Sequence, residues 1–347
     1  MNSPSPIRVL VVDDSALARR AIVDALAHDT SIEVVGVAED AYRAREQILA
    51  LSPDVVTLDL QMPLMDGITF LRILMEHHPV PVIVVSNVTP AGSALALEAL
   101  EAGAVEVIQK PEGRHGVAEL SRRLTAQVHA VAGSKHRHRV AQRPTGQRPV
   151  SPVAQHRLVV IGASTGGVEA LRYLLPQLPA DGPPIVVVQH IPAHFSRVMA
   201  EHLNRLTPFE VREAEDGDVL RPGLCLIAPG DYHITVARSS SGLRLRTIQS
   251  PPVNHCRPSV DVLFRSVAEH VGADAVGVLL TGMGYDGARG LSMIRDAGGA
   301  TLVESQDSCV VFGMPQAAIK LGAAESVVPL EAMGEAILAA VSRRGGA

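Results

Sequence analysis

Short runs of branched apolar residues alternate with amphipathic stretches along the first 131 residues of the chain. The runs have the length and composition of buried strands, and the stretches between and after them place apolar residues at helical spacing. Apolar strands separated by helices indicate a parallel sheet covered on both faces. The pattern predicts a (βα)5 domain at residues 1–131, with strands at 8–12, 32–38, 55–59, 82–85 and 105–108.

The alternation stops at residues 132–155. Lysine, arginine and proline recur between Gly133 and Arg157, and that stretch contains no acidic residue. A polar, proline-rich segment cannot bury enough apolar surface to offset the entropy of ordering it. We therefore expect a flexible basic linker at 132–155, with a basic docking segment as the alternative.

A second series of apolar runs follows at residues 156–347, at 158–161, 185–189, 275–280 and 300–304. Between residues 219 and 248 the character changes, because Pro–Gly and Gly-rich turn signals flank short strands and indicate antiparallel ribbons. The sequence predicts a doubly wound α/β domain with a β-hairpin insertion.

Charge and cysteine content narrow the class of protein. The chain has 347 residues and a net charge of −5, which gives no general electrostatic reason to bind nucleic acid. No apolar run is long enough to cross a bilayer, so we expect no membrane insertion.

Cys225, Cys256 and Cys309 lie far apart, which argues against a zinc site and a disulfide framework. We expect a cytoplasmic monomer.

Polar residues follow all but one of the first five strands. In a parallel sheet they converge at one edge, and a cluster of carboxylates there suits Mg²⁺. With the metal and a lysine screening charge, an aspartate could attack a phosphoryl donor. A helix cap is the simpler explanation for a single strand-end aspartate. The residues of this cluster are Asp13, Asp14, Asp59, Ser86 and Lys110.

The second series begins with a G-x-S-x-G motif, in which Ser164 stands between a strand and a helical stretch. Glycines on both sides of the serine allow the sharp turn of a nucleophile elbow. A glycine-rich phosphate cradle for a dinucleotide is the competing interpretation, and it requires an acidic residue at the next strand end. The chain has Gln189 and His190 there, and a histidine is the general base that a serine nucleophile needs.

A carboxylate should orient that histidine. Asp286 follows the 275–280 run and lies among glycines, so it is the best placed candidate. The same glycines could free the Met283 N–H as a donor to an oxyanion. The alternative is a plain glycine-rich turn capped by an aspartate. The order Ser164, His190, Asp286 differs from that of α/β-hydrolases, which indicates another scaffold with the same catalytic geometry.

The acidic cluster, with Asp66-Gly67 and Lys110-Pro111, resembles the receiver domain of bacterial response regulators over residues 7–131. Val107 departs from the family, because an aromatic switch residue usually lies three positions before the lysine. The resemblance implies Asp59 as phosphoacceptor, Ser86 and Lys110 as phosphoryl contacts, and Asp13, Asp14, Asp59 and the Gln61 carbonyl around Mg²⁺.

The second domain resembles the chemotaxis protein-glutamate methylesterases, the CheB family, in residues 162–167, 189–192 with Phe195, 256–261 and 280–287. The resemblance implies a phosphorylation-activated carboxylic ester hydrolase that acts on glutamate γ-methyl esters of chemoreceptors, releases methanol and also deamidates receptor glutamines. It implies a chemotaxis histidine kinase as phosphodonor, and no cofactor for the esterase. Three alternatives stay open: the same enzyme in a pathway unrelated to motility, a non-catalytic partner-binding regulator, and a DNA-binding regulator.

Overall fold

The chain, seen here in a computed structural model, folds as two units, Met1–His138 and Arg139–Ala347. The structure describes residues 5–86, 90–110, 113–132, 157–193, 195–240 and 242–343. The predicted linker at 132–155 lies outside these residues apart from Ala132, and the predicted start of the second domain at 156 lies outside them as well. These limits stay a prediction.

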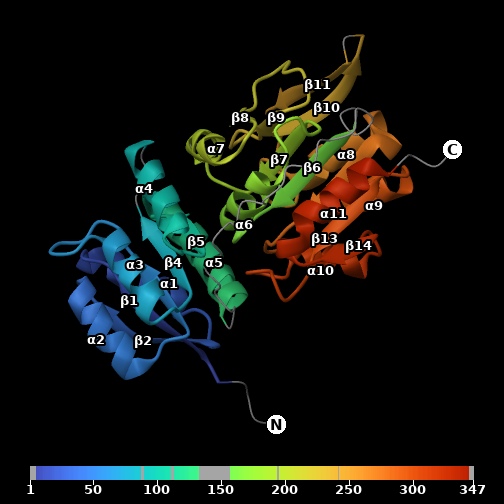
Figure 1. The fold of residues 1–347 in the computed structure, drawn as a ribbon. Helices are drawn as coiled ribbons and strands as arrows, with labels where there is room; N and C mark the ends of the chain where they lie inside the picture. The colour runs from blue at the N-terminus through green and yellow to red at the C-terminus, as the bar shows by residue number, and fades with distance from the viewer. Residues whose placement is uncertain are drawn as a thin grey trace. The chain divides into compact units, whose positions relative to one another are not determined.

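The first unit is a five-stranded parallel sheet in the order β2-β1-β3-β4-β5, with helices on both faces (Figure 1). This arrangement confirms the predicted (βα)5 fold. Its strands are β1 (Ile7–Val12), β2 (Ile32–Ala38), β3 (Val55–Leu58), β4 (Val82–Ser86) and β5 (Glu106–Gln109). Its helices are α1 (Ala16–Leu26), α2 (Ala41–Leu51), α3 (Gly67–His77), α4 (Pro90–Glu101) and α5 (Gly113–Val131).

Side-chain caps fix where the helices of this unit begin. Ser15 accepts the Ala18 N–H and so starts α1, and Asp66 accepts the Thr69 N–H and starts α3. The helix-cap explanation for Asp13 and Asp14 therefore fails, because Ser15 performs that role. Both aspartates stay in the loop that follows β1.

The second unit is built on a seven-stranded parallel sheet and a separate hairpin of β10 and β11. The strands are β6 (Leu158–Ala163), β7 (Ile185–Gln189), β8 (Glu210–Glu213), β9 (Leu224–Ile227), β10 (His233–Ser239), β11 (Gly242–Ile248), β12 (Ala275–Leu279), β13 (Ala300–Glu304) and β14 (Ser326–Val328). The helices are α6 (Gly167–Leu174), α7 (Phe195–Leu206), α8 (Val260–His270), α9 (Ala288–Asp296), α10 (Met314–Lys320) and α11 (Leu330–Ser342), with short 3₁₀ turns η2 (Leu175–Gln177) and η3 (Gly272–Asp274).

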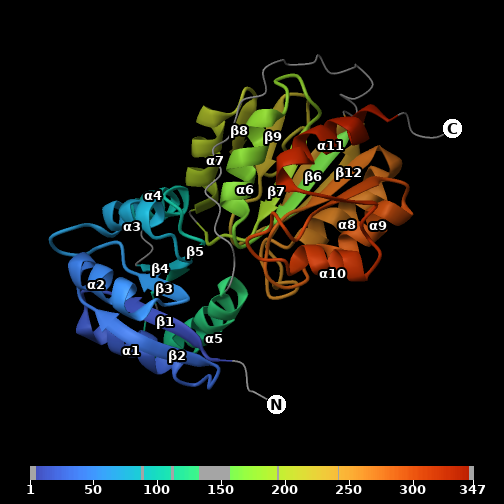
Figure 2. The same cartoon turned by 60° about the horizontal axis from the view of Figure 1, so that its bottom comes forward.

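The strand order β14-β13-β12-β6-β7-β9-β8 shows that the sheet is doubly wound. The chain leaves β6 in one direction through β7 and returns to add β12 on the other side of β6. Helices α6 and α11 pack together, as do α8 and α9, and Figure 2 shows the two pairs on opposite faces of the sheet. In such folds, ligands bind outside the carboxyl ends of the strands, at the point where the order in which strands are added to the sheet reverses. Here that point lies between β6 and β12.

The hairpin insertion is confirmed, but the prediction of antiparallel ribbons throughout residues 219–248 is wrong for β9. This strand pairs in parallel with both β7 and β8. Its four residues are all buried, so the apolar run Leu224–Ile227 extends the main sheet. Among the described residues, no helix is long and apolar enough to cross a membrane.

Candidate active site

Ser164 lies in a tight turn between β6 and α6. Its carbonyl accepts the Gly167 N–H at 2.7 Å, and Gly166 adopts a left-handed φ of 78° at the N-cap of α6. A side chain at position 166 would be strained in that conformation. The turn leaves Ser164 partly exposed at the end of a fully buried strand, which is the strand–turn–helix geometry expected of an elbow.

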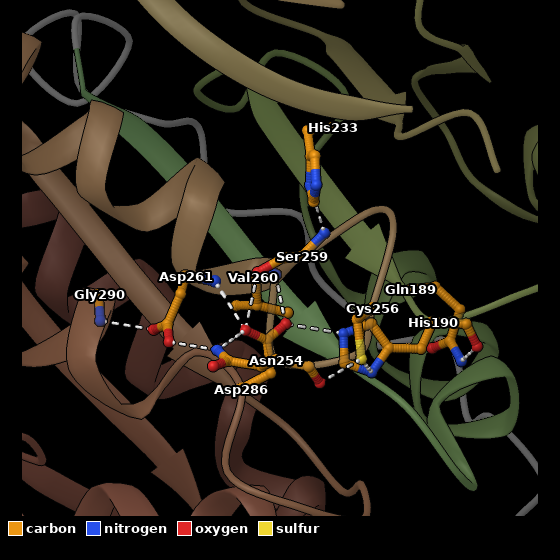
Figure 3. Close-up of polar contacts among 10 residues, drawn as sticks. All are labelled: Gln189, His190, His233, Asn254, Cys256, Ser259, Val260, Asp261, Asp286 and Gly290. Atoms are coloured by element: carbon orange, nitrogen blue, oxygen red, sulfur yellow. Dashed lines mark hydrogen bonds and ion pairs between the residues drawn. The ribbon is translucent and has the colours of Figure 1, made fainter. Parts of the chain in front are cut away.

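His190 follows the neighbouring strand β7. Its backbone N–H donates to the Ala163 carbonyl at 3.0 Å, which holds the histidine beside the residue that precedes Ser164. On its far side the imidazole Nε2 lies 2.9 Å from Asp286 Oδ2 (Figure 3). The structure thus joins His190 and Asp286, which are 96 residues apart in the sequence.

Asp286 is almost fully buried, yet it is surrounded by donors. Burial raises the pKa of a carboxyl group, but here the hydrogen bond and charge of His190, followed by the other donors, outweigh burial and lower the pKa of Asp286. The carboxylate is therefore ionised and fixed in orientation. Besides His190, its donors are the Asn254 amide at 2.7 Å, the Ser259 hydroxyl at 2.8 Å, the Val260 N–H at 2.6 Å and the Asp261 N–H at 3.3 Å.

The Val260 and Asp261 donors belong to the first turn of α8, whose N-terminus favours a negative charge. Asn254 Nδ2 also donates to Asp261 Oδ2 at 2.8 Å, so one amide bridges two neighbouring carboxylates (Figure 3). Burial is the main reason that the pKa of Asp261 is raised, and Asp286 adds to it.

Asn254 and Ser259 were not singled out from the sequence as site residues. Neither stands at a strand end, where a search for polar residues would have found them. The available signal was the resemblance in residues 256–261, which includes Ser259.

The hydroxyl of Ser164 is not hydrogen-bonded to His190 within the described part of the chain. The ring nitrogen that faces away from Asp286, Nδ1, lies 3.6 Å from Cys256 Sγ. Burial would lower the pKa of His190, but contacts with Asp286 and Cys256 outweigh it and raise the pKa. Catalytic hydrogen bonds often form only when substrate binds, so Ser164 stays the proposed partner of the histidine.

Gly282 places the Met283 backbone next to Ser164. A Cβ atom at position 282 would lie 2.7 Å from the Ser164 Cβ, so only glycine fits at this contact. Over the described residues, the Met283 N–H donates to no protein acceptor. An oxyanion donor is required near the serine, and Met283 directly follows the glycine that packs against Ser164.

Gln189 connects the turn that carries Ser164 with the end of β7, where His190 lies. Its buried side-chain amide donates to the Ser164 carbonyl at 2.8 Å and to the His190 carbonyl at 3.2 Å. In the sequence this residue argued against a dinucleotide site and lay in one of the segments that carry the resemblance, but it was not a candidate site residue. The structure shows that it connects the backbones of the two candidate catalytic residues.

The first unit contains the acidic pocket predicted from the sequence. Lys110 Nζ lies 2.8 Å from Asp13 Oδ2 and 2.6 Å from Asp59 Oδ2. Burial raises the pKa of Asp13 despite the opposing effect of Lys110, whereas the two carboxylates raise the pKa of Lys110 in spite of burial. Asp13, Asp14 and Asp59 each present a carboxylate oxygen within 4.8 Å of the others.

Two further candidates lie at the edge of this pocket. The Gln61 N–H donates to Asp59 Oδ1 at 3.3 Å, and Ser86 is the last residue of β4, where its carbonyl accepts the Lys110 N–H at 2.9 Å. Val107, at the position of the usual aromatic switch, is buried in β5. In the pocket Lys110 thus contacts Asp13 and Asp59 directly, with Asp14 nearby and Ser86 on the adjacent strand.

These features define a class: a receiver-like unit joined to a doubly wound α/β unit that carries a His–Asp pair beside a strand-end serine. Family models agree, matching the response regulator receiver domain at residues 9–121 and CheB methylesterase at residues 159–337. The chain belongs to the CheB methylesterase family.

Relatives extend the match over nearly the whole chain. A protein of Syntrophus aciditrophicus named protein-glutamate methylesterase/protein-glutamine glutaminase 2 is 44% identical over 96% of this chain and 99% of its own length. A protein of the same name from Pseudomonas aeruginosa is 46% identical over 98% of each. The crystal structure of the Thermotoga maritima CheB methylesterase catalytic domain is 38% identical, with a TM-score of 0.52, over 53% of this chain and 97% of that one.

Proposed function

We propose that this protein is a phosphorylation-activated protein-glutamate methylesterase that also deamidates glutamine, and that chemoreceptors are its substrates. The observation that carries the proposal is the ionised, five-donor Asp286 bound to His190 beside the Ser164 turn. A buried carboxylate that orients a histidine next to a partly exposed serine is the arrangement of a serine hydrolase. The names of the full-length relatives supply the substrate class.

In the proposed reaction, His190 takes the proton of the Ser164 hydroxyl as its oxygen attacks the ester carbonyl. Asp286 holds Nε2, which leaves Nδ1 as the nitrogen that accepts this proton. Contact between this nitrogen and the Ser164 hydroxyl is then made by rotation of the serine side chain, because Asp286 fixes the imidazole. Asp286 then stabilises the imidazolium that forms.

The Met283 N–H donates to the oxyanion of the tetrahedral intermediate, because Met283 directly follows Gly282 at the serine turn and its N–H has no protein acceptor among the described residues. Collapse of the intermediate expels methanol, which takes the proton from His190. Water then hydrolyses the acyl-enzyme with His190 again as base. A primary amide follows the same steps with ammonia as the leaving group, which accounts for the glutaminase activity.

Methanol release from a methylated chemoreceptor tests this function. We expect Ser164→Ala to lower kcat by at least about 10⁴-fold, since removing the nucleophile of a catalytic triad has effects of that order. Ser305→Ala, in the loop after β13, is the matched control and should keep the wild-type rate. A Ser164→Ala protein that releases methanol at the wild-type rate would refute the assignment.

The acidic pocket is the proposed regulatory site. Its carboxylates offer the hard oxygen ligands that Mg²⁺ prefers, so Asp13, Asp14, Asp59 and the Gln61 carbonyl would hold the ion. When bound, Mg²⁺ would neutralise charge on the incoming phosphoryl group. Asp59 attacks the phosphodonor, a chemotaxis histidine kinase, while Lys110 and Ser86 contact the transferred group. The acyl phosphate then shifts the protein towards its more active state.

A further inference from the structure

Cys256 lies against the catalytic histidine and has no part in the reaction proposed above. Its Sγ is 3.6 Å from His190 Nδ1, and the cysteine is only partly buried. Ligand atoms of His190, Cys256 and Asp286 all lie within 4.8 Å of one another. Thiolate and imidazole together are the ligands that zinc and similar soft cations select.

The separation of the two atoms fits a tetrahedral metal ion. Zinc binds thiolate sulfur at about 2.3 Å and imidazole nitrogen at about 2.0–2.1 Å. For an Sγ–Nδ1 separation of 3.6 Å, these bond lengths give an S–Zn–N angle of about 110°, the tetrahedral value. The observed separation therefore suits two ligands of one tetrahedral ion.

Asp286 completes the arrangement from the far side of the ring. Histidines that bind zinc usually donate their second ring N–H to a carboxylate, which fixes the ring and strengthens the ligand. In His190 the second ring nitrogen is Nε2, and Asp286 Oδ2 lies 2.9 Å from it, in the place of that carboxylate. The carboxylate itself is a poor ligand, because its oxygens already accept hydrogen bonds from Asn254, Ser259 and the start of α8. Water or a product carboxylate would fill the remaining positions.

We propose that Cys256 and His190 form a binding site for a thiophilic divalent cation such as Zn²⁺, and that occupation of this site reversibly inhibits the enzyme. Binding releases the thiol proton and the proton that an imidazolium carries on Nδ1 to solvent, which leaves the imidazole neutral with the Nδ1 lone pair on the metal. The ring can then no longer accept the Ser164 proton. The inhibition rests on the proposed function, whereas metal binding does not.

The sequence argued against a zinc site because the cysteines are not spaced as metal ligands. That inference holds for ligands close together in the chain. Here the fold brings together two residues that are 66 positions apart, one after β7 and one in the segment between β11 and α8.

Cobalt spectroscopy of the full-length protein tests binding without reference to activity. Excess Mg²⁺ is added to occupy the acidic pocket, and Co²⁺ is titrated while thiolate-to-cobalt charge-transfer absorption is recorded. We expect the band in the wild type and in Cys309→Ser, but not in Cys256→Ser. Asp286→Asn should weaken Co²⁺ binding by about 10–100-fold, the usual effect of losing the partner of a ligand histidine. Absence of the band from the wild type, or its persistence in Cys256→Ser, would overturn the site.

Methanol release tests the inhibition. Zn²⁺ should lower the wild-type rate by at least about tenfold at saturation, as expected when a catalytic base is occupied, and a chelator should restore it. The rate of Cys256→Ser, relative to its own zinc-free rate, should be insensitive to the same concentration. If the wild type shows the cobalt band but Zn²⁺ does not change its rate of methanol release, the proposed inhibition is wrong and the binding site stands. A zinc-free wild-type protein that releases no methanol would instead contradict the proposed function.

Discussion

At the scale of single residues, the site depends on keeping one buried carboxylate charged. Removing the Asp286 carboxylate from water costs free energy. The hydrogen bonds that it accepts from the surrounding donors offset this desolvation cost. The donors come from Asn254, Ser259 and the start of α8, so they also fix the direction of the carboxylate. A fixed carboxylate holds His190 in one tautomer, which leaves the other ring nitrogen ready to accept a proton.

The pH dependence of the reaction should report the contact between Cys256 and His190. Only neutral imidazole can act as base, so kcat/KM rises with pH through the pKa of His190. Burial lowers this pKa, while contacts with Asp286 and Cys256 outweigh burial and raise it. We therefore expect Cys256→Ala to move the acidic limb of the profile to lower pH, as measured by methanol release in the presence of a chelator.

Cys309→Ala is the control for this shift, because Cys309 is in the loop after β13 and its Sγ faces the Glu304 carbonyl. Its acidic limb should coincide with that of the wild type. A limb that stays in place or moves to higher pH in Cys256→Ala would contradict the assigned contact.

At the scale of helices and strands, apolar periodicity was sufficient for most of the fold. The strands β2, β7 and β13 match the predicted limits. β7 and β13 are almost entirely buried, whereas β2 is recognised by its apolar residues although it is only partly buried. The sequence did not reveal β8 and β14, because β8 has charged residues at most positions and β14 has only three residues. Pairing with a neighbouring strand, which is a tertiary effect, makes these segments strands.

Close packing between the loop after β12 and the serine turn gives a prediction at this scale. Gly282→Ala would place a Cβ against Met314 Sδ and 2.7 Å from the Ser164 Cβ. The methionine side chain can move aside, but the contact with Ser164 requires a shift of one backbone. We expect kcat to fall by about 10²-fold, since displacements of about 1 Å have effects of this size. Methanol release and the thermal unfolding midpoint should be measured together.

Gly217→Ala is the comparison for this variant. A Cβ at position 217 meets nothing within 4 Å, although the φ of 87° is unfavourable for alanine. This variant should lose about 1 kcal/mol of stability and keep its kcat. Equal loss of kcat in both variants would show that the effect at position 282 is not specific to the serine turn.

At the scale of the whole molecule, the sequence could predict which residues meet at strand ends, but not which residues approach them from loops. Asp13, Asp59 and Lys110 follow strands of one sheet and make the expected contacts. Ser164 and His190 follow neighbouring strands in the same way. Asn254 and Cys256 reach the site from the segment before α8, where no periodic pattern determines the path of the chain.

Phosphorylation should control the rate of the full-length enzyme. With Mg²⁺ and acetyl phosphate we expect the rate of methanol release to increase at least about tenfold, which corresponds to a shift of about 1.4 kcal/mol between two states. Asp59→Asn should remain at the unstimulated rate, because it lacks the carboxylate that becomes phosphorylated.

Asp54→Asn is the control, because Asp54 lies just before β3 and bonds to the Arg8 N–H instead of Lys110. It should respond to acetyl phosphate as the wild type does. Stimulation of Asp59→Asn to the wild-type level would mean that the acidic pocket is not the regulatory site.

The identity of the nucleophile is tested most directly by trapping the acyl-enzyme. The protein is mixed with a slowly hydrolysed activated ester of glutamate, quenched in acid and digested, and the acylated peptide is sequenced by mass spectrometry. We predict that the acyl group is on Ser164 and that labelling is lost in His190→Ala. An acyl group on Cys256, whose sulfur is 3.6 Å from the same histidine, would contradict the account.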